Sequence, residues 1–160
     1  MNILLKTVGL LFLPCLVFAD TQCIAVKVSD GDTFWCVRDE FLYIKGYENA
    51  IQVRLADIDA PEKGQAYGNQ ARKALNKLIY KQVVTLKNTK QDKYGRIVAT
   101  VFSGSTNVNL AMIESGYAWH YERYSNNREY AAAMQKAQQQ KRGLWADKGK
   151  IIKPEDWRHR

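Results

Sequence analysis

The sequence feature that most restricts the fold is an alternation of apolar and polar residues over positions 22–38, interrupted once by Ser29-Asp30-Gly31. A period of two is that of a β-strand, and Ser, Asp and Gly favour turns, so the stretch predicts a β-hairpin. Cys23 and Cys36 are separated by 12 residues and fall on its two strands. They are either joined by a disulfide, as an oxidising compartment would allow, or two buried thiols.

The remaining chain predicts three more strands and three helices. Pro61 must end the strand before it, because proline has no backbone N–H to donate to a neighbouring strand. Asn107 and Asn127 are predicted helix caps. The predicted strands cover 50–56, 83–86 and 97–102, and the predicted helices cover 69–80, 108–116 and 128–142. Five strands with helices packed on them predict an α+β fold, specifically a five-stranded OB-type barrel with three helices.

The N-terminal segment differs in character from the rest. Residues 1–19 combine Lys6 with an apolar run, Thr7 to Phe18, and small residues near Ala19, which is typical of a secretory signal peptide. The run of about 12 residues is shorter than the roughly 20 that cross a bilayer. We therefore expect export to a periplasm or the medium, without membrane attachment once the signal is removed. Residues 20–146 are expected to form one domain and 147–160 a basic, solvated tail, in a monomer with no evident protein partner.

Charged residues gather at the predicted turns and strand ends of a basic chain with 24 Lys plus Arg against 16 Asp plus Glu. Carboxylates are hard oxygen ligands that suit Ca²⁺ or Mg²⁺, whereas two histidines and no zinc-like Cys/His spacing argue against zinc. The charged motifs are Asp30-Gly31-Asp32-Thr33, Arg54 with Asp57-Ile58-Asp59-Ala60-Pro61-Glu62, and Asp92-Lys93-Tyr94-Gly95-Arg96.

These motifs contain what phosphodiester hydrolysis requires. Arg54 and Arg96 are forked donors suited to phosphate, whose oxygens a cation can share. Glu62 is the natural base for an attacking water because neither histidine lies in an acidic motif, and Asp32 and Asp59 are the candidate metal ligands. The same motifs also occur as ordinary turns and surface ion pairs, so the residues alone leave that alternative open.

Taken together, the motifs resemble those of the micrococcal nuclease (thermonuclease) family. They occur in the family's order and at similar spacing over about residues 22–146. Beyond the charged motifs, the similarity includes Val28-Ser29, Asn107-Val108-Asn109-Leu110, Gly116-Tyr117-Ala118 and Gly143-Leu144-Trp145. The resemblance implies a five-stranded OB barrel with three helices. It also implies a Ca²⁺-dependent nuclease that cuts DNA and RNA, single-stranded or locally melted, to 3′-phosphate products.

The resemblance assigns a metal site and a base. Asp32 and Asp59 would bind Ca²⁺ through their side chains, and Ala60 through its backbone carbonyl. Glu62 would activate the attacking water. Ala60 stands where the best-known family member has threonine, which spares the carbonyl but removes a hydroxyl near the metal.

The resemblance also assigns contacts to the substrate. Arg54 and Arg96 would hold the scissile phosphate and stabilise its developing charge, while Lys93 and Tyr94 would contact the neighbouring 3′-side phosphate or sugar. An exposed aromatic ring would stack on a base without reading sequence. The residues that compete for this stacking role are Trp119, Tyr121 and Tyr124, of which Tyr124 is our choice.

The alternative function is a non-catalytic OB-fold nucleic-acid-binding protein, in which basic residues follow the backbone and the acidic set is structural. A pure binder has no need for a carboxylate such as Glu62 close to a phosphate that it must attract. The combination of Glu62 with Arg54, Arg96 and two aspartates of metal-ligand type therefore favours the enzyme.

Overall fold

The computed structural model describes residues 20–38, 47, 49–147, 149 and 151–160. The predicted signal peptide, residues 1–19, lies outside the described residues. Within the described part of the chain, no helix has both the length and the apolar character needed to cross a bilayer.

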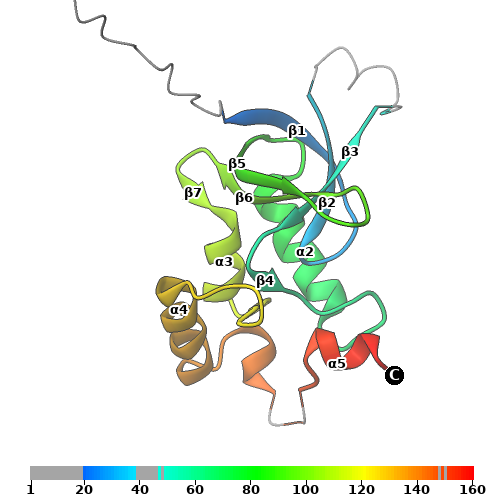
Figure 1. Cartoon of the computed structure of the whole chain (residues 1–160). Coiled ribbons are helices and arrows are strands. Elements are labelled where there is room, and N and C mark those ends of the chain that lie inside the picture. Colours follow the sequence, from blue (N-terminus) through cyan, green and yellow to red (C-terminus); the bar gives the residue numbers. More distant parts are fainter. Residues whose placement is uncertain (1–19, 39–46, 48, 148, 150) are drawn as a thin grey trace, which may run out of the picture.

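Five strands close into a barrel at the top of the molecule as drawn in Figure 1. Antiparallel neighbours follow the order β3-β2-β1-β5-β6, and a parallel pairing of β3 with β6 completes the circle, with Arg54 opposite Val98. The strands are β1 (Thr21–Val28), β2 (Thr33–Val37), β3 (Ile51–Leu55), β5 (Val83–Gln91) and β6 (Ile97–Ser103). The predicted α+β class and five-stranded barrel are confirmed.

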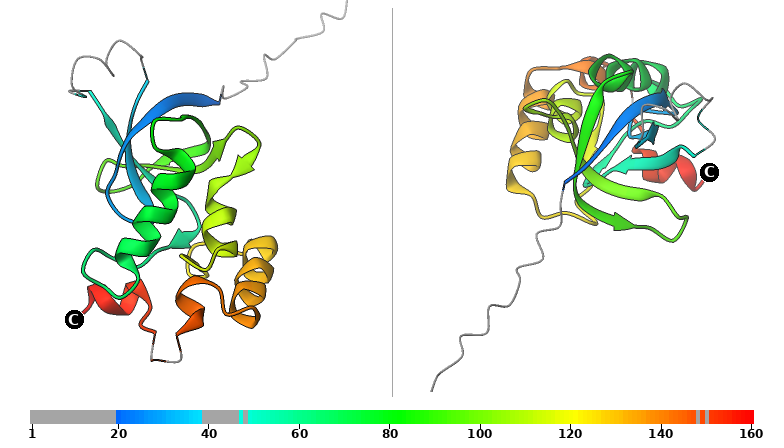
Figure 2. Two further views of the ribbon diagram at one scale, coloured as in Figure 1. Left: turned by 180° about the vertical axis from the view of Figure 1, so that it is seen from behind. Right: turned by 90° about the horizontal axis from the view of Figure 1, so that it is seen from above.

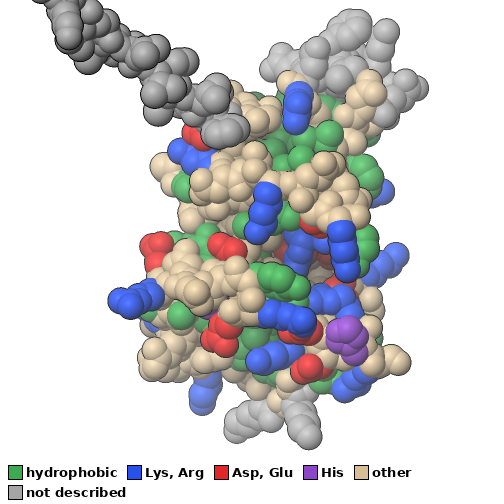
Figure 3. Space-filling model, in the orientation of Figure 1, with side chains coloured by type: hydrophobic (Ala, Val, Ile, Leu, Met, Phe, Trp, Pro, Cys, Tyr) green, Lys and Arg blue, Asp and Glu red, His purple; other side chains and the backbone are tan. Residues whose placement is uncertain are grey.

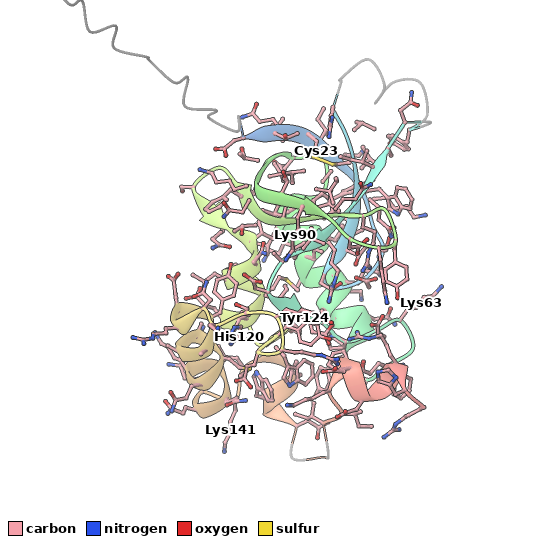
Figure 4. The ribbon with its side chains drawn as sticks, viewed as in Figure 1. Cys23, Lys63, Lys90, His120, Tyr124 and Lys141 are labelled. Carbon is pink, nitrogen blue, oxygen red and sulfur yellow. A yellow bond between two sulfur atoms is a disulfide. The ribbon has the colours of Figure 1, made fainter. Side chains whose placement is uncertain are left out.

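The hairpin of β1 and β2 faces the core mainly with residues outside the alternation that predicted it. That alternation consists of Ile24, Val26, Val28, Thr33, Trp35 and Val37, of which Val28 lies in the core. Phe34 and Cys36 are fully buried, whereas Trp35 lies on the partly exposed face. In β1 a bulge between Ala25 and Lys27 shifts the phase. The structure has a disulfide between Cys23 and Cys36, the bridged one of the two alternatives, and Cys23 is labelled in Figure 4.

The three predicted helices lie against the barrel and below it. Asn107 and Asn127 cap α3 and α4 as predicted: their Oδ1 atoms accept hydrogen bonds from the N–H groups of Leu110 (3.1 Å) and Glu129 (3.0 Å). The helix α4 ends before the predicted Arg142, and a 3-10 turn follows it. The bounds are α2 (Gly68–Ile79), α3 (Val108–Glu114), α4 (Arg128–Gln139) and the 3-10 turn η1 (Gly143–Ala146).

Helix α2 follows its predicted apolar face. Ala71, Leu75 and Ile79 are fully buried in the core, which they share with the inward residues of the strands. Seen from behind, α2 lies across the back of the barrel (Figure 2). The opposite face, where the turns between strands meet the loop after β3, is thereby left open to solvent.

Three two-residue strands were too short to be predicted from periodicity. β7 (Thr106–Asn107) extends the sheet beside β6, and β4 (Ile58–Asp59) pairs with β8 (Trp119–His120). In the latter pair Asp59 lies opposite Trp119, and the N–H of Tyr121 donates to the carbonyl of Asp57 at 2.9 Å. This pairing fixes the acidic segment after β3 to the chain that follows α3.

The expectation of a solvated tail is wrong for its last part. Residues Pro154–Arg158 form a short helix, α5, which packs beside the start of α2 (Figure 1). Pro154, at the first turn, is buried, the carbonyl of Ile152 accepts a hydrogen bond from Gln65 Nε2 at 2.7 Å, and Glu155 pairs with Arg123 at 2.5 Å. The tail was misjudged because these partners are distant in sequence.

Candidate active site

The turn between β1 and β2 brings two aspartates together. The N–H of Asp32 donates to Asp30 Oδ1 at 3.0 Å, which stabilises the turn. A Cβ atom on Gly31 would lie 2.6 Å from the Cβ atoms of Ala60 and Ala71, so only glycine lets the turn pack this closely against the acidic segment and α2. Burial, reinforced by the charge of Asp32, raises the pKa of Asp30 to about 7.

Arg54 of β3 links the two carboxylates that the sequence assigns to the metal. Its Nη1 lies 2.6 Å from Asp32 Oδ2 and its Nη2 lies 3.0 Å from Asp59 Oδ1, with only 15% of its side chain exposed. Burial opposes ionisation of Asp32, but Arg54 and the N–H of Ala60 outweigh it, so the pKa of Asp32 lies below its usual value. Burial opposes the charge of Arg54, but the two carboxylates outweigh it and raise its pKa, which keeps the guanidinium charged.

Arg158 of α5 binds the other side of the same acidic group. Its Nη1 and Nη2 lie 3.0 and 2.9 Å from the two oxygens of Asp59, and Nη1 also lies 2.6 Å from Glu62 Oε1. Burial raises the pKa of Asp59 above its usual value, and the hydrogen bonds from Arg158 act against that rise. No feature of the sequence around Arg158 indicated this contact.

Asn109 of α3 holds the chain just before the acidic segment. It is fully buried, and its Nδ2 donates to the carbonyls of Ala56 (2.8 Å) and Ala99 (3.2 Å), while its Oδ1 accepts from the N–H of Val101 (3.0 Å). One side chain thus joins α3, β6 and the end of β3. Sequence analysis placed Asn109 in a family-like motif but gave it no role.

The loop that carries Glu62 is braced by Gln65. The Glu62 N–H donates to Gln65 Oε1 at 2.9 Å, and the Gln65 N–H donates back to the Glu62 carbonyl at 3.0 Å. A Cβ atom on Gly68 would lie 2.1 Å from that carbonyl, so the loop folds tightly over the start of α2. The backbone of Glu62 is therefore fixed, while its side chain borders the pocket, where Arg158 holds one carboxylate oxygen.

The turn between β5 and β6 orients Arg96. Asp92 Oδ1 accepts from the N–H groups of Tyr94 (2.9 Å) and Arg96 (3.0 Å), and its Oδ2 accepts from Arg96 Nε at 2.8 Å. Desolvation raises the pKa of Asp92, but these hydrogen bonds lower it by more, so the pKa lies below its usual value. Lys93 Nζ and the Arg96 guanidinium lie 5.0 and 5.4 Å from the ring centre of Tyr94.

A pocket of about 910 Å³ joins these pieces, and most of the predicted site residues line it. Figure 3 shows Lys and Arg side chains gathered around Asp and Glu side chains on the right half of this face. Asp59 and Ala60 are buried and do not line the pocket; Arg54 contacts Asp59, and the Ala60 N–H donates to Asp32 Oδ2 at 2.9 Å. The predicted residues that line the pocket are Asp32, Arg54, Glu62, Lys93, Tyr94, Arg96 and Tyr124.

The three competing aromatic residues have different surroundings. Trp119 is 7% exposed and packs edge-on against Trp145, with ring centres 5.2 Å apart, so it belongs to the core. Tyr121 and Tyr124 both line the pocket, and their ring centres lie 4.9 Å apart. Tyr124 is 65% exposed and lies on the open face between the barrel and the lower helices (Figure 4). Its ring is therefore the more accessible to a base.

The donor set of the pocket suits a hard cation. Within the described residues, no three His, Cys, Asp or Glu side chains are arranged as a metal-binding group, and the oxygens of Asp32 and Asp59 are held by arginines. Two carboxylates with the carbonyl of Ala60 are nevertheless the ligands that Ca²⁺ prefers, and water or substrate can complete its six to eight oxygens. The residues fit Ca²⁺ in the kind of ligand they offer, and Arg54 and Arg158 are the groups that a cation would meet at these oxygens.

Known proteins are similar to this chain over most of its length. A family model described as staphylococcal nuclease homologue matches residues 52–147. An uncharacterized endonuclease of Haemophilus influenzae is 43% identical over 136 residues, which are 85% of this chain and 72% of that protein. An uncharacterized endonuclease of Escherichia coli is 37% identical over 143 residues (89% and 88%), and a micrococcal nuclease of Shigella flexneri is 34% identical over 152 residues (88% and 82%). On these matches the chain belongs to the staphylococcal nuclease family.

Proposed function

We propose that this nuclease is an exported, Ca²⁺-dependent enzyme that hydrolyses DNA and RNA to 3′-phosphate products. Membership of the family makes it a phosphodiester hydrolase. The observation that carries the finer proposal is the convergence of Glu62, Arg54 and Arg96 on one pocket, from three separate segments of the chain.

The two arginines would hold the scissile phosphate. A guanidinium presents two N–H groups to two phosphate oxygens, and its charge offsets the negative charge that grows as phosphorus becomes five-coordinate. Arg54 is oriented by Asp32 and Asp59, and Arg96 by Asp92, so neither has to be ordered when substrate binds. This preorganisation is what electrostatic catalysis requires.

Glu62 would take the proton of the attacking water. Its carboxylate borders the pocket, and the Gln65 brace holds its backbone in place. Ca²⁺ on Asp32, Asp59 and the Ala60 carbonyl would supply positive charge beside the phosphate. The chain's own residues would then position the water, the phosphate and the base.

The surface around the pocket suits a single strand of either DNA or RNA. Tyr94 and Tyr124 are 71% and 65% exposed, and stacking on aromatic rings accepts any base. Lys90 and Lys93 on the same rim supply charge for the neighbouring phosphates. These contacts support DNA and RNA as substrates, single-stranded or locally melted.

Export is supported by two features of the chain. Residues 1–19 have the pattern of a signal peptide, and the disulfide between Cys23 and Cys36 is of a kind that persists in oxidising compartments. A periplasm and the medium are both compatible with these features.

The decisive experiment compares residues 20–160 with the Glu62→Gln variant on single-stranded DNA and RNA, with Ca²⁺, Mg²⁺ or chelator. We expect Ca²⁺-dependent cleavage, and a loss of kcat of about 10²–10⁴-fold in the variant, because a general base is removed without changing the shape of the side chain. Glu129→Gln, in the exposed first turn of α4, is the matched control and should cleave normally.

One observation favours the alternative of a non-catalytic binding protein: arginines already hold the oxygens of Asp32 and Asp59, as expected of structural ion pairs. The same experiment separates the two functions. Tight binding of nucleic acid without cleavage under every metal would support the binding protein, and an unchanged kcat in Glu62→Gln would remove the base role from Glu62.

A further inference from the structure

Two contacts anchor helix α5, one to the loop that carries Glu62 and one to the segment after β8. Gln65, which braces Glu62, also donates to the carbonyl of Ile152 at 2.7 Å, just ahead of the helix. Glu155, in the first turn, pairs with Arg123 of the segment after β8. Because these contacts hold α5 from both sides, Arg158 at its end is directed at the acidic group.

Arg158 uses the same oxygen atoms that the proposed chemistry requires. It donates to both carboxylate oxygens of Asp59 and to one oxygen of Glu62. A cation at Asp59 would compete for these oxygens and would be repelled by the guanidinium charge. The oxygen of Glu62 that Arg158 holds is also not available to a water in the pocket.

We propose that α5 is an autoinhibitory strap: Arg158 blocks Asp59 and Glu62, and Ca²⁺ must displace it before the nuclease can act. This inference rests on the proposed function, since it assumes that Ca²⁺ binds Asp59. The strap lies beyond residues 52–147, the part of the chain that the family model matches.

Arg158 reaches the acidic group from the solvent side. Its side chain is 36% exposed although that of Asp59 is only 3% exposed, so a divalent cation can approach the shared oxygens and replace the guanidinium. The apparent association constant for Ca²⁺ then equals the intrinsic constant multiplied by the fraction of molecules in which the strap is undocked. An exported nuclease with such a strap would stay inactive at low Ca²⁺ and become active where Ca²⁺ is abundant.

The test measures Ca²⁺ binding by calorimetry on residues 20–160, independently of activity. We expect Arg158→Ala to bind Ca²⁺ about tenfold more tightly than the unchanged chain, because it loses a competing charge at the site. Arg160→Ala is the matched control: it removes the same charge two residues away, where Arg160 contacts Trp157, and should leave the affinity unchanged. Glu155→Gln, which loosens an anchor of α5, should shift the affinity in the same direction as Arg158→Ala, but less.

A second readout follows the strap itself. Hydrogen exchange at the amides of α5 should speed up when Ca²⁺ is added to the unchanged chain, and this change should be absent in Arg158→Ala. Unfolding curves in chelator establish that each variant is folded.

The outcomes distinguish this inference from the proposed function. If Arg158→Ala binds Ca²⁺ no more tightly and cleaves more slowly, Arg158 is a third phosphate-binding arginine and the strap is refuted, while Ca²⁺-dependent cleavage by the unchanged chain keeps the proposed function. If neither protein binds Ca²⁺ or cleaves nucleic acid, the proposed function fails and the strap fails with it.

Discussion

The arginines of this site are oriented by ion pairs with aspartates. Asp32 and Asp59 hold Arg54, Asp92 holds Arg96, and each pair includes a hydrogen bond or contact of 3.0 Å or less. In the proposed function the acidic residues would have two roles: Asp32 and Asp59 would also hold the metal, whereas Asp92 would only orient Arg96. The second role is testable without any metal.

Asp92→Asn should separate the charge of Asp92 from its shape, since asparagine keeps Oδ1 as an acceptor for the two backbone amides. Its lowered pKa means that Asp92 contributes stability above the unfolded pKa and loses it as pH falls through the folded pKa. The variant should therefore be less stable at pH 7, by up to about 1 kcal/mol for a pair near the surface, and the difference should disappear as the pH falls through the folded pKa of Asp92. Urea unfolding from pH 2 to 8 checks this, and a difference independent of pH would contradict it.

At the scale of elements, the active-site segment is positioned by neighbours on both sides. β8 pairs with β4, and α3 holds the end of β3 through Asn109. Because β4 has only two residues, its own pairing is weak, and the buried Asn109 side chain is the stronger constraint on where the acidic segment begins.

Asn109→Ala should therefore affect stability and catalysis together. It leaves the buried N–H of Val101 and the carbonyl of Ala56 unpaired, which costs on the order of 3 kcal/mol. In the folded fraction, kcat should also fall because the acidic segment is less well fixed. Asn107→Ala is the control: it removes the cap of α3, at a cost of about 1 kcal/mol, and should leave kcat unchanged. Equal kcat for the two variants would show that Asn109 is a packing residue only.

For the whole molecule, the barrel depends on contacts between segments that are far apart in sequence. The β3–β6 pairing closes it, and the disulfide between Cys23 and Cys36 fastens the first hairpin within the core. The site lies on turns and loops that this closed barrel holds in place. Loss of the disulfide should weaken the whole domain and leave the site's own contacts intact.

The double variant Cys23→Ala with Cys36→Ala should lower the free energy of unfolding by about 3 kcal/mol, the chain-entropy value for a loop of this size. The kcat at a temperature well below the midpoint should change little, because neither cysteine lines the pocket. Thermal unfolding with and without reductant measures the first effect. A large loss of kcat in fully folded variant would instead place the disulfide in the active-site geometry.

The sequence by itself determined the features that depend on local chemistry. Strand and helix positions follow from period and caps, and the motifs around Asp32, Glu62 and Arg96 identify the family and the candidate site. Which residues of β1 face the core was harder to predict, because the bulge between Ala25 and Lys27 shifts the alternation by one residue. The β5 strand also runs to Gln91, well past the predicted residue 86, because its exposed end shows no alternation.

Only the tertiary structure decided which groups meet. Arg158 contacts Asp59 across 99 positions of sequence, and Asn109 reaches Ala56 across 53. Neither contact leaves a local pattern, because any surface arginine or helical asparagine looks the same in sequence until the folded chain supplies its partner. The chemistry of the site was thus local information, whereas its positioning, and its occupation by the tail, depend on the packing of distant segments.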